Sequence, residues 1–255
     1  MGKVVFIGSG PGAADLITLR GARRLAEADV VLFDALTDPA LRELAPNATW
    51  VDVGKRGFCD STGQTKINAL LVKHGREAGL VVRLKGGDPS VFARLEEELE
   101  ALVEAGIEAE VVPGVTAALA AAAQAQRPLT RRGSGRSVSL TTAMTRERSL
   151  QGRRSADTEV FYMAGRQLAA LSRRLVEAGW EADAPVSVVS RAGWPDALVS
   201  SHHVGRLAEA AVLHAGRPTV VTVGAGAAAV PGQAGQAPTT RDIESRQGGR
   251  TTSTP

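Results

Sequence analysis

Residues Val4–Asp15 read VVFIGSGPGAAD: an apolar run, then a glycine turn, then the start of a helix-like segment. The turn fits the pattern G-x-G-x-x-A at Gly8, Gly10 and Ala13, which is typical of folds that bind a dinucleotide. Such folds also need an acidic residue about 20 positions farther on, at the end of the second strand, and Asp34 stands there. Taken alone, this opening favours a nicotinamide or flavin oxidoreductase. The alternative is a turn that is needed only for packing.

The first half of the chain alternates strand-like and helix-like segments. We expect strands at residues 4–7, 29–34 and 50–53, a strand that enters a glycine turn at 80–89, and another within 109–114. Apolar residues recur at helical spacing in three groups: Leu16, Leu19, Ala22, Leu25 and Ala26; Ile67, Leu70 and Leu71; and Phe92, Leu95, Leu99, Leu102 and Val103. This alternation predicts a mainly parallel sheet with helices on both faces.

The texture changes at residues 115–137, where an Ala-rich helical stretch gives way at Pro128 to a loop of Gly, Arg and Ser. Beyond it we expect strands at 137–142, 158–163, 185–190, 197–203 and 219–223, and a helix marked by Leu168, Leu171, Leu175 and Val176. The prediction is therefore an α/β protein with an N-terminal domain at 1–115 and a smaller C-terminal domain at 116–226. We expect both to have mainly parallel or mixed sheets. The tail at 227–255 has no periodicity and is expected to be disordered.

Composition narrows the class of protein. The chain has 255 residues, of which 44% are hydrophobic and 22% charged, as in ordinary globular proteins. No apolar stretch approaches the ~20 residues that span a bilayer, and no signal-peptide pattern is present. Cys59 is the only cysteine, which excludes a disulfide framework and a cysteine metal cluster. We therefore expect a cytoplasmic protein that does not bind a membrane.

Charge and aromatic content argue against two further classes. The net charge is only +3, and one Tyr and three Trp are too few for a base-stacking surface, so we expect no nucleic-acid partner. The four histidines form no zinc-like ligand set, and we expect no metal. Basic residues do gather near turns, where they can line an anion site or simply form a solvated surface. They are Lys55, Arg56, Arg83, Lys85, Arg127, Arg131, Arg132 and Arg136.

Glycine turns follow five of the expected strands: GSGPG (8–12), VGKRG (53–57), LKGGDP (84–89), VVPGVT (111–116) and YMAG (162–165). In open α/β sheets, ligands bind beyond the carboxyl ends of the strands. Five such turns predict the walls of one cleft between the two domains. Backbone donors and acceptors spread over many loops suit a compact, folded ligand better than an extended dinucleotide.

These turns also carry a family resemblance. The following segments occur in order over about residues 3–224: VVFIGSGPGAADLITLRG, ADVVLFDALT, VGKRG, VVRLKGGDPSVFARLEEE, VVPGVTAA, RPLTRRG, SVSLTTA, FYMAG and SRAGWPDA. The ordered set resembles the tetrapyrrole (precorrin/corrin) C-methyltransferases, and GKR with LKGGDP is most similar to the branch that methylates uroporphyrinogen III. The resemblance implies S-adenosylmethionine as cofactor, with S-adenosylhomocysteine as its product, and an anionic tetrapyrrole as substrate. It also implies two α/β domains around a cleft, and a homodimer.

The same resemblance assigns roles to individual residues. It implies that Asp34 accepts a proton and that Lys55 donates one. The implied cofactor contacts are Pro11, Gly86, Gly87, Asp88, Val91, Thr116, Ala117, Met163 and Gly193. The implied substrate contacts are Arg94, Glu97 and Arg132, since arginine can hold a carboxylate through two parallel hydrogen bonds. Alternative interpretations are a capping Asp34, a solvated Lys55, a core Met163 and an Arg94 that pairs with Glu97 on an exposed helix face.

The sequence also departs from the family pattern. Ala13 stands where an acidic residue is usual, ARLEEE replaces GRGGEE, and TTAMT replaces a segment that often contains TGH. The first change predicts a weaker contact in the cofactor loop. The second predicts a stiffer helix entrance beside the substrate, which leaves open a later precorrin as substrate or a tetrapyrrole-binding protein without activity.

Overall fold

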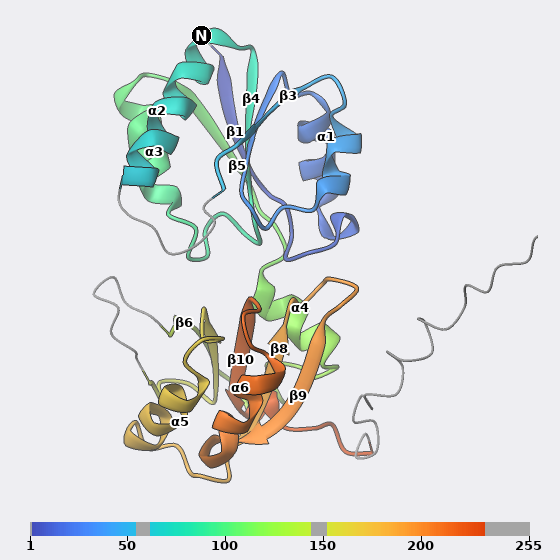
Figure 1. Cartoon of the computed structure of the whole chain (residues 1–255), viewed down its shortest axis with the longest axis vertical. Coiled ribbons are helices and arrows are strands. Elements are labelled where there is room, and N and C mark those ends of the chain that lie inside the picture. The colour runs from blue at the N-terminus through green and yellow to red at the C-terminus, as the bar shows by residue number, and fades with distance from the viewer. Residues whose placement is uncertain (1, 55–61, 144–151, 233–255) are drawn as a thin grey trace, which may run out of the picture.

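The computed structural model describes residues 2–54, 62–143 and 152–232, which form two α/β units joined by a single crossing of the chain (Figure 1). Each unit is built on a five-stranded sheet. The crossing lies at residues 113–116, between the last strand of the first sheet and the first helix of the second unit. In the described residues, no helix is long and apolar enough to span a membrane.

The first sheet is entirely parallel, as its sequence predicts. Its strands are β1 (Lys3–Gly8), β2 (Val30–Phe33), β3 (Thr49–Asp52), β4 (Leu80–Lys85) and β5 (Glu108–Val112), in the order β3-β2-β4-β1-β5. The two central strands are buried almost throughout because helices cover both faces of the sheet. Since all five strands run the same way, their carboxyl ends meet at one edge, and that edge faces the second unit (Figure 1).

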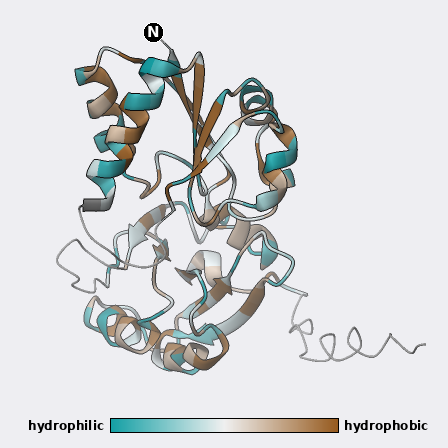
Figure 2. Cartoon of the chain, turned by 45° about the horizontal axis from the view of Figure 1, so that its top comes forward, coloured by the Kyte–Doolittle hydropathy of each residue, from teal (hydrophilic) through white to brown (hydrophobic). Residues whose placement is uncertain are grey.

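Helices cover both faces of this sheet. The 3-10 helices η1 (Ala14–Leu16) and η2 (Pro39–Leu44) and the helix α1 (Leu19–Ala26) lie on one side, and α2 (Thr62–Glu77) and α3 (Leu95–Glu104) lie on the other. Brown segments in Figure 2 mark the apolar strands between these helices, whose surfaces alternate brown and teal.

The predicted apolar faces need correction at their ends. Thr18 caps α1 by accepting a hydrogen bond from the Gly21 amide at 3.1 Å, so the buried positions are Gly21 and Leu25, and Leu19 is 78% exposed. Val103 was expected beside Leu102, but adjacent residues lie about 100° apart on a helix, and Val103 is 76% exposed.

The second sheet is mixed. Its strands are β6 (Val138–Thr142), β7 (Thr158–Tyr162), β8 (Pro185–Ser190), β9 (Leu198–His203) and β10 (Thr219–Gly224), in the order β6-β7-β10-β8-β9. Only β6 and β7 are parallel, and the other three pairs are antiparallel.

The second sheet is also covered on both faces. Helix α4 (Ala117–Gln124) packs small alanine side chains against Val160, Val189 and Val220. The opposite face carries α5 (Leu168–Glu177), η3 (Val204–Glu209) and α6 (Ala210–Leu213). The chain then enters η4 (Ala225–Ala227), and the predicted tail lies mostly outside the described residues.

Candidate active site

Three of the predicted glycine turns pack directly on one another at the carboxyl edge of the first sheet. The Gly87 amide donates to the Gly10 carbonyl at 2.7 Å, and the Gly10 amide donates to the Gly87 carbonyl at 3.3 Å. A Cβ on Gly8 would lie 2.6 Å from the Gly87 oxygen and 2.5 Å from the Gly114 Cα. Only glycine permits this approach, so the turns after β1, β4 and β5 form one continuous surface.

The second unit adds a fourth loop to this surface. The Ala13 amide donates to the Gly193 carbonyl at 2.9 Å. Gly193 has a φ of +81°, and a Cβ there would lie 3.1 Å from Pro11 Cγ. Pro11 and Gly193 therefore lie side by side, although they were singled out in motifs that are far apart in the sequence.

Tyr162, at the end of β7, links the two units from the other side. Its Oη lies 2.7 Å from Thr116 Oγ1 and accepts a hydrogen bond from the Ala118 amide at 3.3 Å. Its ring meets that of Phe92 edge-on, with centroids 5.0 Å apart. Burial raises the pKa of Tyr162, so the neutral hydroxyl is favoured. No sequence pattern singled out Tyr162 beyond its place in the YMAG turn.

Met163 lies just past the end of β7 and not in its interior. It has a left-handed backbone, with φ +58°, and its side chain is 45% exposed. The interpretation of Met163 as an ordinary core residue is therefore wrong.

The turn after β4 is fastened by Asp88. Its Oδ1 accepts the Ser90 amide at 2.7 Å and its Oδ2 accepts the Gly114 amide at 2.9 Å. A Cβ added to Gly86 would meet only Leu36, at 3.4 Å, and a Cβ on Gly87 would have nothing closer than 4.0 Å. Beside these two glycines the backbone is thus open to a ligand. Val91 follows at the end of the turn, where its amide donates to the Asp88 carbonyl at 3.2 Å.

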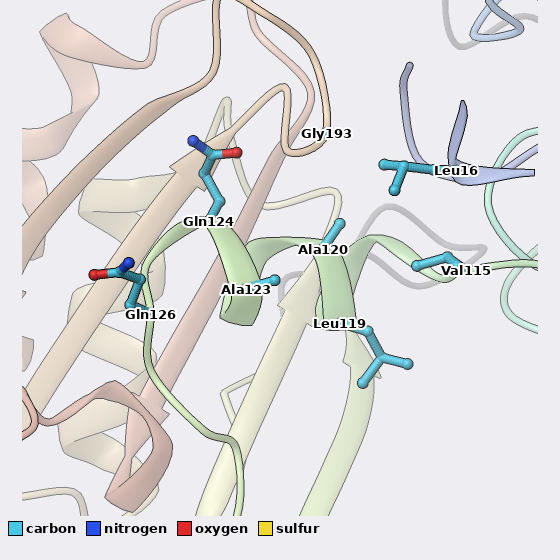
Figure 3. Close-up of a pocket in the computed structure, with 8 residues that line it drawn as sticks. All are labelled: Leu16, Val115, Leu119, Ala120, Ala123, Gln124, Gln126 and Gly193. Atoms are coloured by element: carbon cyan, nitrogen blue, oxygen red, sulfur yellow. The ribbon is translucent and has the colours of Figure 1, made fainter. Parts of the chain in front are cut away.

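An adjoining pocket of about 630 Å³ lies along α4, between the two units (Figure 3). Leu16 and Val115 belong to the first unit and the crossing, and Leu119, Ala120 and Ala123 belong to α4. The remaining lining residues are Gln124, Gln126 and Gly193. Of the residues predicted to touch the cofactor, only Gly193 lines this pocket, so the pocket borders the glycine turns without containing them.

Asp34 ends β2 beside a buried cation. Its Oδ1 accepts a hydrogen bond from Arg83 Nη2 at 2.6 Å, and its side chain is 31% exposed. The prediction that Arg83 and Lys85 line an anion site at the surface is wrong, because their side chains are each only 2% exposed. Both instead bind Glu98 of α3, at 3.3 and 2.8 Å. Arg83 thus occupies Oδ1 of Asp34 and leaves Oδ2 without a hydrogen bond among the described residues.

The buried ions change one another's proton affinity. Burial lowers the pKa of Arg83, but the Asp34 and Glu98 carboxylates outweigh it and raise the pKa overall. Burial, and next the Arg83 cation, lower the pKa of Lys85.

Arg94 and Glu97 form an exposed pair at the start of α3. Arg94 Nε and Nη2 donate to the two Glu97 carboxylate oxygens at 2.6 and 2.5 Å, and the side chains are 43% and 44% exposed. The hydrogen bonds that Arg94 donates to the Glu97 carboxylate raise the pKa of Arg94. Phe92 and Arg94 both have left-handed backbone, with φ +53° and +56°. Such strain in residues other than glycine clusters at functional sites.

The structure does not gather every predicted residue at this edge. Lys55 lies outside the described residues. Arg132 is exposed in the loop before β6, and the register of β6 with β7 places that loop at the opposite end of the sheet from Tyr162. Neighbouring Arg127 and Arg131 donate to backbone carbonyls of residues 227–229, so they are not directed at the glycine turns.

At Ala13, where the family usually has an acidic residue, the turn that follows is capped by a residue from another segment. Ala13 precedes η1 and supplies no side-chain cap. The Ala14 amide donates instead to Asp38 Oδ2 at 3.0 Å, while Asp38 Oδ1 accepts the Ala40 amide at 2.9 Å. Asp38 therefore caps two turns at once, which no local sequence pattern indicated.

Comparisons with known proteins agree with this architecture. The family model for tetrapyrrole (corrin/porphyrin) methylases matches residues 3–211. The uroporphyrinogen-III C-methyltransferase of Pseudomonas aeruginosa is 44% identical over 195 residues, which are 75% of this chain and 80% of that protein. The siroheme synthase of Edwardsiella ictaluri is 41% identical over 193 residues, but the chain spans only 42% of its length.

Solved structures show the same likeness. The uroporphyrin-III C-methyl transferase of Thermus thermophilus, complexed with S-adenyl homocysteine, has a TM-score of 0.75 and 34% identity, covering 88% of this chain and 97% of that one. A cobalt precorrin-4 methyltransferase has a TM-score of 0.78 and 29% identity, covering 89% of this chain and 96% of that one.

Proposed function

Because the chain belongs to the tetrapyrrole (corrin/porphyrin) methylase family, we propose that it is an S-adenosylmethionine-dependent uroporphyrinogen-III C-methyltransferase that forms precorrin-2. The product would serve cobalamin or siroheme biosynthesis. The observation that carries this proposal is the single surface made by glycine turns from both units, with Asp34 and the Arg94–Glu97 pair at its border. The likeness to the Pseudomonas and Thermus enzymes supports it.

The residues present fit an S-adenosylmethionine site. Gly86 and Gly87 leave open space on the side where a Cβ would stand, as close contact between backbone and ligand requires. Met163 offers an exposed, polarizable side chain, and Thr116 is fixed by Tyr162. The proposed contacts are Pro11, Gly86, Gly87, Asp88, Val91, Thr116, Ala117, Met163 and Gly193. When bound, the cofactor supplies a methyl group on a positively charged sulfur.

The proposed substrate is a macrocycle with many carboxylates and apolar ring faces. Arg94 can hold a substrate carboxylate as it now holds Glu97, through two parallel hydrogen bonds. Leu36, Phe92 and Met163 are exposed by 53%, 45% and 45% near the ends of β2, β4 and β7, which provides apolar contact for the rings. We propose Arg94, Glu97 and Arg132 as substrate residues, although Arg132 lies at the far end of the second sheet in the single chain.

The chain's main task in this reaction is to position the substrate. Holding the reacting carbon in line with the methyl group contributes roughly 7–11 kcal/mol to lowering the barrier. A proton must leave the substrate carbon that gains the methyl group, and we assign its acceptance to Asp34. We assign proton donation to Lys55.

An anaerobic assay tests the activity. Purified protein is incubated with uroporphyrinogen III and S-adenosylmethionine, and the product is identified by its mass and absorption. We expect addition of two methyl groups. Asp34→Ala and Arg94→Ala are both expected to lower turnover while S-adenosylhomocysteine still binds. Binding of S-adenosylhomocysteine without any methylated product would contradict the proposal and favour a binding protein.

A later precorrin is the second candidate substrate. The TM-score of 0.78 to a cobalt precorrin-4 methyltransferase favours it, as does the replacement of GRGGEE by ARLEEE at the helix entrance. Turnover of a later precorrin, with none of uroporphyrinogen III, would select this alternative.

We also propose that the enzyme acts in the cytoplasm as a homodimer, on the strength of the family resemblance. Light scattering during size-exclusion chromatography tests the dimer, because a monomer mass at micromolar concentration would contradict it.

A further inference from the structure

Asp34 contacts a group of buried charged side chains that the proposed reaction does not itself require. Arg83 and Lys85 occupy alternate positions of β4 and meet Glu98 of α3; we call these three residues the buried ion cluster. Their side chains are 2%, 2% and 1% exposed. Apolar residues of similar size would often stabilise such a position equally well, because buried ions lose their hydration. The cluster therefore calls for an explanation other than stability.

Arg83 fixes Asp34 in one orientation. Its Nη2 donates to Asp34 Oδ1 at 2.6 Å, and its Nε donates to Glu98 Oε2 at 3.3 Å. Its Nη1 donates to two main-chain carbonyls, Leu32 at 3.4 Å and Leu84 at 3.2 Å. The planar guanidinium is thus held by two strands and a helix, and it cannot turn without losing several hydrogen bonds.

Glu98 connects Arg83 to the Arg94–Glu97 pair, which we propose binds the substrate. Besides Arg83, it accepts hydrogen bonds from Lys85 Nζ at 2.8 Å and from Gln64 Nε2 at 3.1 Å. It directly follows Glu97, which holds Arg94 at the surface. The first turn of α3 therefore connects the interior charges to the exposed pair.

We propose that Arg83 and Glu98 are positioning residues, which hold the Asp34 carboxylate at a fixed place relative to the Arg94–Glu97 pair. This inference rests on the proposed function and on the role of Asp34 in it. Arg83 occupies Oδ1, and among the described residues Oδ2 accepts no hydrogen bond, so Oδ2 is the atom that takes the substrate proton. The Asp34 and Glu98 carboxylates raise the pKa of Arg83, so Arg83 stays charged while it holds Asp34.

The test is a double-mutant cycle of Arg83→Gln and Asp34→Asn. Loss of orientation should lower kcat of Arg83→Gln by about 10- to 100-fold, with KM and S-adenosylhomocysteine affinity little changed. Arg83→Lys should recover part of kcat, because it restores the charge without the planar group. In the Asp34→Asn background, Arg83→Gln should lower kcat by less than about twofold.

Glu98→Gln provides a second variant, which keeps the shape of the side chain if Arg83→Gln fails to fold. It should lower kcat with KM little changed. Arg174→Gln, in an exposed pair on α5, is the matched control and should leave kcat and KM unchanged.

The outcomes separate this inference from the proposed function. An equal loss of kcat from Arg83→Gln in both backgrounds, or an unchanged kcat in both Arg83→Gln and Glu98→Gln, overturns the positioning role. Full activity of Asp34→Asn overturns it too, while methylation by the unmodified enzyme leaves the proposed function standing. An unmodified enzyme that methylates no tetrapyrrole removes both.

Discussion

The two units bury polar side chains in different ways. The first unit encloses the buried ion cluster, whose two cations are paired with Glu98 and with the partly exposed Asp34. The second encloses His214, which is fully buried, with Nδ1 2.9 Å from Ser190 Oγ and Nε2 2.8 Å from Ser200 Oγ. Burial, followed by nearby His202 and Arg217, lowers the pKa of His214 to about 4. One interior thus depends on charges staying paired, and the other depends on a ring staying neutral.

The strongest test of this contrast removes a partner from the charged interior. Glu98→Ala leaves Arg83 and Lys85 buried without an adequate counter-charge, and we expect a loss of about 3–5 kcal/mol in the free energy of unfolding. Urea denaturation measures it. Glu177→Ala, which breaks an exposed pair on α5, is the control and should cost less than about 1 kcal/mol. Equal losses in the two variants would show that the buried ion pairs contribute no more to the free energy of unfolding than an exposed pair does.

The neutral interior should respond to acid. Above pH 6.5 His214 is neutral in both the folded and the unfolded chain, so it contributes no pH dependence. Between pH 6.5 and about 4 only the unfolded chain takes up the proton, so the free energy of unfolding falls as the pH falls, by roughly 2–3 kcal/mol. His214→Gln should lack this part of the dependence. Parallel curves for the two proteins over this range would contradict the prediction.

A smaller effect is expected where the two units touch. Tyr162→Phe removes the hydrogen bonds of Oη to Thr116 and Ala118 but keeps the ring contact with Phe92. We expect S-adenosylhomocysteine to bind about fivefold more weakly, which corresponds to about 1 kcal/mol. Isothermal titration calorimetry measures this change. Unchanged affinity would show that Thr116 needs no support from the second unit.

The smallest effect on stability is expected from the exposed pairs. Arg94–Glu97 and Arg174–Glu177 have the same spacing in the sequence, so replacing either arginine by Ala should change the free energy of unfolding by about 0.5 kcal/mol or less. Only Arg94→Ala should raise KM for the tetrapyrrole, by about tenfold or more, because a bidentate contact to a carboxylate is lost. A normal KM would remove Arg94 from the proposed site.

The sequence predicted the strands well because most of them are short and rich in apolar residues, and because glycine turns follow five of them. β8 occupies the predicted residues, and β1, β2 and β3 are within one residue of them. The buried faces of the helices were predicted less accurately. The residue at which a helix begins decides which of its side chains face the sheet, and the spacing of apolar residues does not fix that residue. Leu19 and Val103 are apolar and regularly spaced, yet both are exposed.

The site was predictable where backbone geometry demands a particular residue, and not where charges meet across the fold. Pro11, Gly87 and Gly193, which the family resemblance singled out, lie in loops that pack together, and their role in binding stays a prediction. The buried pair of Arg83 and Glu98 was not predicted, since a basic residue before a glycine turn has the same sequence appearance at the surface and in the interior. The same limitation applies to Asp38, whose partner amide lies 24 residues away.

The close packing of Gly8, Gly87 and Gly114 also guides redesign of the enzyme. A side chain at Gly8 or Gly114 would push the backbone of the turn after β4, so these positions allow no gradual change of substrate range. Leu36 borders the same surface with an exposed side chain that has room to vary. Libraries that aim at new macrocycles should therefore leave the three glycines fixed and diversify Leu36.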